Sequence, residues 1–435
     1  MSIQANLGMN GKSAAAKQPR RTAAAPKGLS PAKKPLSPDA QKLSDGRVMK
    51  YRLQRAAQKL LPEWSVACCH RHSKERLTSD RVVDINLHRN SGKASFGNLV
   101  TCGSVWVCPV CGAKISEGRR EELQTGMAFH IEQSGTVAMA TYTVPHIFDQ
   151  SLEHVLKRLS EALSRMKSWA AYKKIMKQVG SKGAVRSLEV TYGQNGWHPH
   201  AHELIFCDSR DDLLETLEQI RALWEKAVRL VGLGQINEHG FKVHNGDYAA
   251  EYVAKFGREA QTQHWGAASE LTRFHSKKGV NKNRTPFDLL RDYLFLNCAQ
   301  SGALFVEYAE AFKGKRQLFY SPGLKKHLGL KEVSDDELAL DPEGPEVELI
   351  GSLDFEAWKT VLRHDARGEV LTLAELRGFG AVLQFVALLK AEKGRDVPYF
   401  SEQKRRVFGG LLAMKAYANP SRLFAPVAAN GLQAH

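Results

Sequence analysis

The sequence predicts an α+β fold with a cysteine-rich module in front of it, and three observations predict this. Two extended runs surround Gly193–Gly196, and the residues GQNG tolerate positive φ, so residues 184–206 form a predicted β-hairpin. Apolar residues recur at helical spacing in residues 151–169 and 211–230, as in helices that pack on a sheet. Five of the seven cysteines lie between Cys68 and Cys111, which indicates the separate module.

The remaining elements follow from local patterns. They are a basic helix at 48–61, a helix at 115–133, a strand at 136–145, a strand around Phe241 and Val243, and a helix at 247–260. Composition divides the chain into four predicted parts. These are a disordered basic tail (1–45), a Cys-rich region (46–120), a domain that contains the hairpin (121–330) and a C-terminal region of unknown role (331–435).

The overall charge indicates a polyanionic partner. The formal net charge is +16 and the pI is near 9.5, and Lys and Arg bind phosphates with release of counterions. The tail carries eight Lys or Arg residues against one acid, Asp39, and can be either a solvated tail or a DNA-clamping arm. We find no signal peptide and no run of roughly 18 apolar residues, so no membrane contact is expected. The clustered, odd-numbered cysteines favour reduced thiols and a cytoplasmic location.

The hairpin gathers three histidines and a carboxylate. Pairing across the loop sets Tyr192 opposite Trp197, Thr191 opposite His198 and Glu189 opposite His200. Because strand side chains alternate, Glu189, His198, His200 and His202 then share one face. Two His residues at i and i+2 beside a carboxylate form one side of a divalent-ion site, with open positions for substrate. Mn²⁺ or Mg²⁺ is favoured, and Zn²⁺ also suits these ligands. The alternative is a row of surface histidines.

The helix at 247–260 carries a candidate nucleophile. Tyr248, Tyr252 and Lys255 share one helical face. A tyrosine that attacks a phosphodiester needs its phenol, which normally titrates near pH 10, close to a metal or an ammonium group. The ammonium group of Lys255 can supply part of this positive charge. Taken alone, however, an amphipathic helix bearing tyrosine is ordinary core architecture.

The cysteine spacing indicates a structural Zn²⁺ site, and we expect the region around it to bind DNA. Cys102, Cys108 and Cys111 offer three thiolates, and CPxC is a tight turn that chelates zinc. The fourth ligand comes from a group of which Cys69 is favoured: Cys68, Cys69, His70 and His72. The alternative is buried cysteines without a metal. The basic residues that follow the module either contact DNA or form a solvated helix face: Lys114, Arg119 and Arg120.

Three motifs in order resemble those of HUH endonucleases. They are a strand that ends in TVP (143–145), the paired-His strand WHPHAHELIF (197–206) and YVAKF (252–256). Within that group the sequence resembles the replication initiator (Rep) proteins of rolling-circle plasmids. The likeness covers roughly residues 65–330 and includes RTPFDLL (284–290) and EAFKGKRQLFYSPGLKKHLGL (310–330).

The resemblance implies an HUH endonuclease core in residues 121–330, a central antiparallel sheet that carries the His pair with the tyrosine helix alongside. It also implies the zinc module. His200 and His202 match the paired metal ligands, and Tyr252 matches the nucleophile. The implied activity is nicking of an origin strand, which leaves a 5′-phosphotyrosyl link and a 3′-hydroxyl primer, followed by rejoining of the strand.

The chain departs from the family pattern at Phe256. Phage-type initiators have tyrosine at both of two positions four residues apart, and some plasmid Reps have Glu and then Tyr, whereas this chain has Tyr252 and Phe256. Tyr252 is therefore the expected nucleophile, with Tyr248 in reserve. Two means of ending replication stay open, a second tyrosine or a water activated by Glu251 or Glu270.

The expected partner is origin DNA, single-stranded or extruded at the nick, together with a host helicase and polymerase. No nucleotide cofactor is expected, because rejoining reverses the attack and no GxxxxGK[ST] motif is present. A relaxase or a rolling-circle transposase would use the same residues. A non-enzymatic, zinc-bearing DNA-binding regulator would bind DNA without nicking it.

Overall fold

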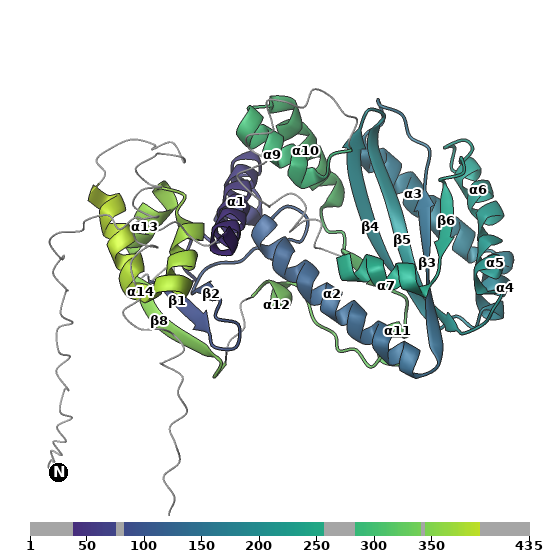
Figure 1. The fold of residues 1–435 in the computed structure, drawn as a ribbon. Coiled ribbons are helices and arrows are strands. Elements are labelled where there is room, and N and C mark those ends of the chain that lie inside the picture. The colour runs from purple at the N-terminus through teal and green to yellow at the C-terminus, as the bar shows by residue number, and fades with distance from the viewer. Residues whose placement is uncertain (1–37, 75–81, 256–282, 341–343, 392–435) are drawn as a thin grey trace, which may run out of the picture.

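The computed structural model describes residues 38–74, 82–255, 283–340 and 344–391 (Figure 1). Residues 1–37 of the predicted tail, Phe256 and Glu270 lie outside these ranges. Up to the tyrosine helix, the elements are α1 (Pro38–Leu60), η1 (Ser65–Cys68), β1 (Val83–His88), β2 (Ala94–Gly97), α2 (Pro109–Glu132), β3 (Gly135–Thr143), α3 (Leu152–Ser168), α4 (Ala170–Gln178), β4 (Gly183–Gly193), β5 (Gly196–Asp208), α5 (Leu213–Glu218), α6 (Ile220–Leu230), β6 (Phe241–His244) and α7 (Gly246–Lys255). After it come α9 (Pro286–Leu296), α10 (Ala299–Phe312), β7 (Leu318–Tyr320), α11 (Leu324–His327), α12 (Asp335–Ala339), β8 (Val347–Leu353), α13 (Phe355–Arg363) and α14 (Arg367–Ala391).

A five-stranded antiparallel sheet in the order β6-β3-β5-β4-β7 forms the centre of the larger part of the molecule. Helices α3 to α6 cover one face, and α2 and α7 lie against the other (Figure 1). The α+β class predicted from the sequence is therefore confirmed. The single helix expected at 211–230 is two helices, α5 and α6, which meet at Gln219.

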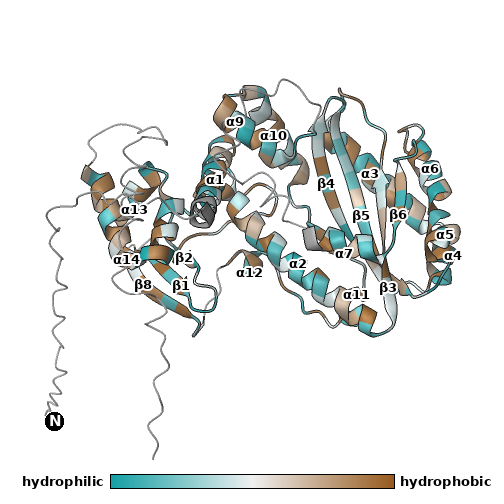
Figure 2. Cartoon of the chain, viewed as in Figure 1, coloured by the Kyte–Doolittle hydropathy of each residue, from teal (hydrophilic) through white to brown (hydrophobic). Residues whose placement is uncertain are grey.

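Side chains on the two faces of β5 pack in different hydrophobic cores, because successive side chains of a strand point in opposite directions. Ala201 and Ile205 are buried in the core that the sheet shares with α3 and α6. Leu204 and Phe206 are buried in the second core, which includes Val253 of α7. Figure 2 shows both hydrophobic and hydrophilic bands along β4 and β5. His198, His200 and His202 continue the Leu204 face, so the histidines lie on the side of the sheet that carries α7.

The hairpin has the predicted register. Tyr192 pairs with Trp197, and Glu189 pairs with His200. The turn is shorter than the four-residue loop expected, because Gly193 itself pairs with Gly196, whose φ of +81° suits glycine. The shorter turn does not change the register, because Gly193 and Gly196 add one more pair to the same β4–β5 pairing.

A second, three-stranded antiparallel sheet has the order β2-β1-β8 and packs with α1, α13 and α14. Strand β8 follows residue 330, whereas its partner β1 lies in the Cys-rich region, so elements from both sides of the predicted boundary share one sheet. The division into four domains stays a prediction. Helix α1 begins at Pro38, ahead of the boundary near residue 46 that composition suggests, and packs against α14.

Helix α14 departs from the expectation that no segment approaches a membrane span. Among the described residues it is the one helix long and apolar enough by length and composition to cross a membrane, although core helices pass the same test. Its backbone leaves helical geometry at Gly378, where φ is 75°. Val382 and Phe385 beyond that break are buried in the core with α1 and β1. This packing matches a core helix.

Candidate metal centre and active site

The hairpin strands bring Glu189, His200 and His202 together as the sequence predicts. Nε2 of His200 and Nε2 of His202 each lie 3.3 Å from Oε2 of Glu189. The two imidazole rings are 4.8 Å apart at their centroids. Both histidine side chains are largely buried, at 17% and 11% exposure, whereas Glu189 keeps 38%. The group therefore opens to solvent on the carboxylate side.

This group fits a divalent cation. Its three ligand atoms all lie within 4.8 Å of one another. Adjacent ligands of an octahedral ion with bonds of about 2.1 Å are separated by roughly 3 Å, close to the 3.3 Å found here. Imidazole and carboxylate ligands together suit Mn²⁺ and accept Mg²⁺. The three residues leave several coordination positions for water or a phosphate.

The charge state of Glu189 suits a metal ligand. Burial raises the pKa of Glu189, but hydrogen bonds from His200 and His202, together with their charges, outweigh burial and hold its pKa well below the usual range. The carboxylate is therefore ionised at neutral pH and attracts cations.

Helix α7 places Tyr252 on the same carboxylate. The Tyr252 hydroxyl donates to Oε1 of Glu189 at 2.7 Å, and its ring lies 4.9 Å from that of His202. Ser187 Oγ is 2.8 Å from the same hydroxyl and, because the phenolic proton points to Glu189, Ser187 donates to the Tyr252 oxygen. Ser187 is opposite His202 in the hairpin register and is buried. Sequence reasoning missed Ser187, which no motif distinguishes from other strand serines.

A second missed residue, Thr141, orients His202. Strand β3 pairs with β5 so that Thr141 is opposite His202, and its Oγ1 lies 2.9 Å from His202 Nδ1. When Nε2 binds a metal, Nδ1 would carry the ring proton, donate to this hydroxyl and fix the ring. His200 differs, because its buried Nδ1 has no hydrogen-bond partner among the described residues.

The other candidate residues of helix α7 lie apart from the contact between Tyr252 and Glu189. Tyr248 stacks on His244, with ring centroids 3.9 Å apart, and is 45% exposed. Glu251 is exposed and, like Tyr248, lines the cavity beside the metal group. Lys255 is the last residue of α7, and its side chain lies outside the described part of the chain.

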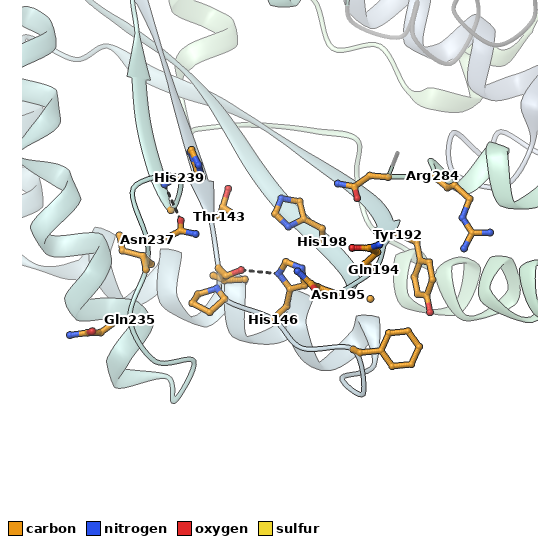
Figure 3. Close-up of a pocket in the computed structure, with 18 of the residues that line it drawn as sticks. Thr143, His146, Tyr192, Gln194, Asn195, His198, Gln235, Asn237, His239 and Arg284 are labelled. Carbon is orange, nitrogen blue, oxygen red and sulfur yellow. Dashed lines mark hydrogen bonds between the residues drawn. The ribbon is translucent and has the colours of Figure 1, made fainter. Parts of the chain in front are cut away.

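His198, the further metal candidate, faces a different cavity. Its ring is 5.5 Å from that of His200 and 4.7 Å from that of His146, and it is not one of the three grouped ligands. Figure 3 shows His198 and His146 in a cavity of about 970 Å³ with Thr143, Gln194 and other polar side chains. Burial, with His200 and His146 nearby, lowers the pKa of His198 to about 4. His198 is therefore neutral at pH 7.

The four cysteines expected to bind zinc lie together: Cys69, Cys102, Cys108 and Cys111. Cys69 Sγ is 3.7 Å from Cys108 Sγ and 3.5 Å from Cys111 Sγ, and Cys102 Sγ is 3.7 Å from Cys111 Sγ. A tetrahedral zinc ion with Zn–S bonds of about 2.3 Å sets its sulfurs roughly 3.8 Å apart. The group therefore fits a tetrahedral metal. Cys68, another candidate for the fourth ligand, is at the end of η1 and outside the group.

The surroundings of the cysteines support thiolate chemistry. Burial raises the pKa of the Cys108 thiol, but hydrogen bonds from Cys102, Cys111 and Cys69 hold it well below the ordinary value, whereas bonds to Cys108 and Cys111 raise the pKa of Cys102. Four such close thiols cannot all ionise without a cation between them. Gln54 of α1 donates to Cys108 Sγ at 3.3 Å, as ligand-orienting residues do.

The basic residues that follow the cysteines are engaged within the protein. Arg119 forms ion pairs with Glu122 and Asp335, both at 2.7 Å, and Arg120 pairs with Glu117 at 2.5 Å. Both arginines are buried. Lys114 Nζ donates to the carbonyl of Ala339 in α12 at 3.4 Å. The contacts of Arg119 with Asp335 and of Lys114 with Ala339 link α2 to α12. DNA binding by the three basic residues stays a prediction.

Comparison with known proteins identifies the family of the chain. The profile of the replication protein family matches residues 98–360, more than half of the chain. A curated relative, "Protein rep" of Streptomyces lividans, is 27% identical over 358 residues, which cover 66% of this chain and 77% of the relative. The "Neomycin resistance protein" of Streptomyces cyanogenus is 27% identical over 147 residues, 28% of this chain and 34% of that protein. No solved structure matches. The chain belongs to the replication protein (Rep) family of rolling-circle plasmids, as its ordered motifs imply.

Proposed function

We propose that this protein initiates rolling-circle replication by nicking one strand of its plasmid origin with Tyr252. The sheet with its His pair and tyrosine helix would be an HUH endonuclease core. Three contacts support the proposal: Glu189 Oε2 faces His200 and His202 at 3.3 Å, and Glu189 Oε1 accepts from Tyr252 at 2.7 Å. One carboxylate thus joins the candidate metal ligands to the candidate nucleophile, and this observation carries the proposal.

In the proposed reaction the Tyr252 oxygen bonds to the phosphorus of the scissile phosphodiester, and the bond from phosphorus to the 3′-oxygen breaks. The phenolic proton ends on the released 3′-hydroxyl, directly or through water. That hydroxyl primes a polymerase, and the 5′-phosphotyrosyl bond keeps the energy needed for rejoining. Ser187 and Glu189 hold the phenol in place, and Lys255, three residues along α7, would add positive charge nearby.

Glu189, His200 and His202 would hold Mn²⁺ or Mg²⁺. When bound, the ion would polarise a phosphate oxygen of the substrate and balance its charge. Cys69, Cys102, Cys108 and Cys111 would hold a structural Zn²⁺. The scissile strand would enter single-stranded or extruded, in the cytoplasm of the plasmid-bearing cell, where a host helicase and polymerase would extend the primer.

The experiment is a covalent-adduct assay. The full-length protein is incubated with Mn²⁺ or Mg²⁺ and a supercoiled plasmid that carries its gene region, and the products are separated under denaturing conditions. We expect relaxed plasmid with protein attached to a 5′ end, and no adduct with Tyr252→Phe. An adduct of unchanged yield with Tyr252→Phe would rule out this nucleophile.

Variants of the histidine ligands test whether the His pair and the cysteine group are separate metal sites. His200→Ala and His202→Ala should each abolish nicking while the zinc content of the protein is unchanged. DNA binding without nicking by the wild-type protein would instead support the regulator hypothesis. Dependence of the nick on transfer or transposon-end sequences, in place of a replication origin, would favour a relaxase or transposase.

A further inference from the structure

A cavity of about 510 Å³ lies directly beside Glu189, His200 and Tyr252. This volume falls in the range of roughly 300–1,000 Å³ typical of small-molecule sites. Other parts of the fold form the remaining walls: Trp106 and Pro109 from the start of α2 and the loop before it, and Phe287 from α9. The candidate nucleophile and metal ligands therefore line one cavity together with aromatic side chains.

Trp106 is held in a fixed orientation on the wall of this cavity. Its indole Nε1 donates to the carbonyl of Lys315 at 2.6 Å, and its ring packs on Phe312 of α10 at 4.5 Å between centroids. The Tyr308 hydroxyl donates to the carbonyl of Trp106 at 3.2 Å. Trp106 is also half-buried and lies between Cys102 and Cys108 in the sequence, two of the four grouped cysteines. A preset aromatic ring in a nucleic-acid site is a stacking platform for a base.

Gln317 also lines this cavity, and one end of its side-chain amide is unsatisfied. It precedes β7, and its Nε2 donates to Ser116 Oγ of α2 at 2.9 Å. Its Oε1 is buried and has no hydrogen-bond partner among the described residues. If the amide is turned by 180°, the oxygen meets Ser116 and the amino group is left unpaired instead. Buried polar atoms nearly always have partners, so a ligand that completes this bond would be favoured. Glutamine amides are well suited to the edges of nucleobases.

We propose that this cavity binds the base of a nucleotide that flanks the scissile phosphate, stacked on Trp106 and hydrogen-bonded by Gln317. The inference rests on the proposed nicking function and adds a determinant of sequence specificity to it. A base held here fixes the phosphate to which it is attached, so the same contacts that select the sequence also align the phosphodiester with Tyr252.

The first test combines a protein variant with a substrate change. The nick is mapped on the plasmid, and single-stranded oligonucleotides that span it are prepared with one abasic site at each of the three positions on either side. On the intact oligonucleotide, Trp106→Ala should lower kcat/KM for nicking by roughly 5- to 150-fold, the effect of losing one base–aromatic stack. At one flanking position the abasic substrate should remove this penalty, since the stack is already absent.

Each comparison is made between two substrates with the same enzyme preparation. A loss of active protein through partial unfolding of Trp106→Ala therefore lowers both rates equally and does not change their ratio. Trp106→Phe, which keeps an aromatic ring, should restore most of the rate on the intact oligonucleotide. Trp169→Ala is the matched control, because Trp169 is also half-buried but packs in the core on the opposite face of the sheet. A Trp106→Ala penalty that is the same at all six abasic positions would overturn the proposal.

The second test concerns base identity. At the position that the abasic scan identifies, wild-type protein should prefer one base by roughly 5-fold or more, and Gln317→Ala should reduce that preference. Unchanged discrimination by Gln317→Ala would overturn its role. Failure of the nicking function and failure of this inference are distinguishable. Absence of any adduct with wild-type protein would rule out the nicking function. Efficient nicking with a Trp106→Ala penalty that no abasic position removes would rule out this inference alone.

Discussion

Tyr252 and Glu189 are joined by a hydrogen bond of 2.7 Å, which runs from the phenol to the carboxylate oxygen that does not face the histidines. The two residues are 63 positions apart in sequence and lie on different elements. This contact makes the orientation of the phenol depend on the same side chain that completes the candidate metal group.

Ser187→Ala is expected to slow nicking without abolishing it. Ser187 donates to the Tyr252 oxygen at 2.8 Å, so its removal takes away one of the hydrogen bonds that orient the phenol. The loss of one such hydrogen bond is worth about 0.5–1.5 kcal/mol, which corresponds to a roughly 2- to 12-fold lower rate of adduct formation. Single-turnover adduct assays at saturating Mn²⁺ measure this. A rate equal to that of wild-type protein would show that Ser187 does not position the nucleophile.

Thr141→Val is expected to weaken metal binding at the His pair. Thr141 orients His202 through a 2.9 Å contact to Nδ1, and loss of such a partner typically costs 10- to 100-fold in metal affinity or activity. The concentration of Mn²⁺ needed for half-maximal nicking should rise accordingly. Thr143→Val, on the same strand but opposite His200, is the control and should leave this value unchanged. An unchanged Mn²⁺ requirement in Thr141→Val would contradict the orienting role.

The hairpin site could be predicted because its geometry is local. Strand alternation and the short turn place Glu189 opposite His200, and neither depends on the rest of the chain. Ser187 and Thr141 could not be predicted, because their roles arise only when α7 and β3 pack beside the hairpin. Pairing of β8 with β1 was also beyond reach, since no short motif records contacts between strands so distant in sequence.

Cysteine spacing predicted three of the four candidate zinc ligands and did not identify the fourth. Cys68 and Cys69 are adjacent in sequence, and only the course of η1 distinguishes them, because it buries Cys69 beside Cys108. Composition places the end of the tail near residue 45, whereas helix α1 begins at Pro38. No local pattern indicates that α14, far along the chain, packs against α1.

Tyr248→Phe is expected to retain formation of the first covalent adduct. The Tyr248 ring stacks on His244, and no hydrogen bond to Glu189 is found for it among the described residues, so it is not placed as Tyr252 is. Adduct yield on an origin oligonucleotide should stay within about 2-fold of wild type, while Tyr252→Phe gives none. Strand rejoining by the same Tyr248→Phe protein should be measured in parallel. Loss of rejoining alone would identify Tyr248 as a second tyrosine that ends replication, and loss of the first adduct would contradict our assignment.

Cys108→Ser is expected to release the structural metal. Cys108 belongs to the cysteine group and caps the N-terminus of α2, where it accepts from the backbone amide of Cys111. Elemental analysis of the purified wild-type protein should give one zinc per chain, and the variant should give much less. Cys298→Ser, outside the group, should keep its zinc. Full zinc content in Cys108→Ser would refute the site.

Arg367→Leu is expected to destabilise the protein and loosen the cysteine group, although residue 367 lies beyond the predicted catalytic domain. The buried guanidinium donates to Gln54 Oε1 at 2.7 Å and to the carbonyls of His70 and Tyr51, both at 3.2 Å. Gln54 in turn donates to Cys108 Sγ at 3.3 Å, so the start of α14 is linked to a candidate zinc ligand through one side chain.

Leucine in place of Arg367 leaves buried acceptors without a donor, which should lower the free energy of unfolding by about 1–3 kcal/mol. It should also weaken zinc retention against a chelator, because Gln54 loses the partner that orients it. Denaturant titration and a zinc-release assay measure the two effects. Arg363→Leu, an exposed change on α13, is the control and should alter neither. Normal stability with normal zinc retention in Arg367→Leu would show that the C-terminal helices do not support the cysteine module.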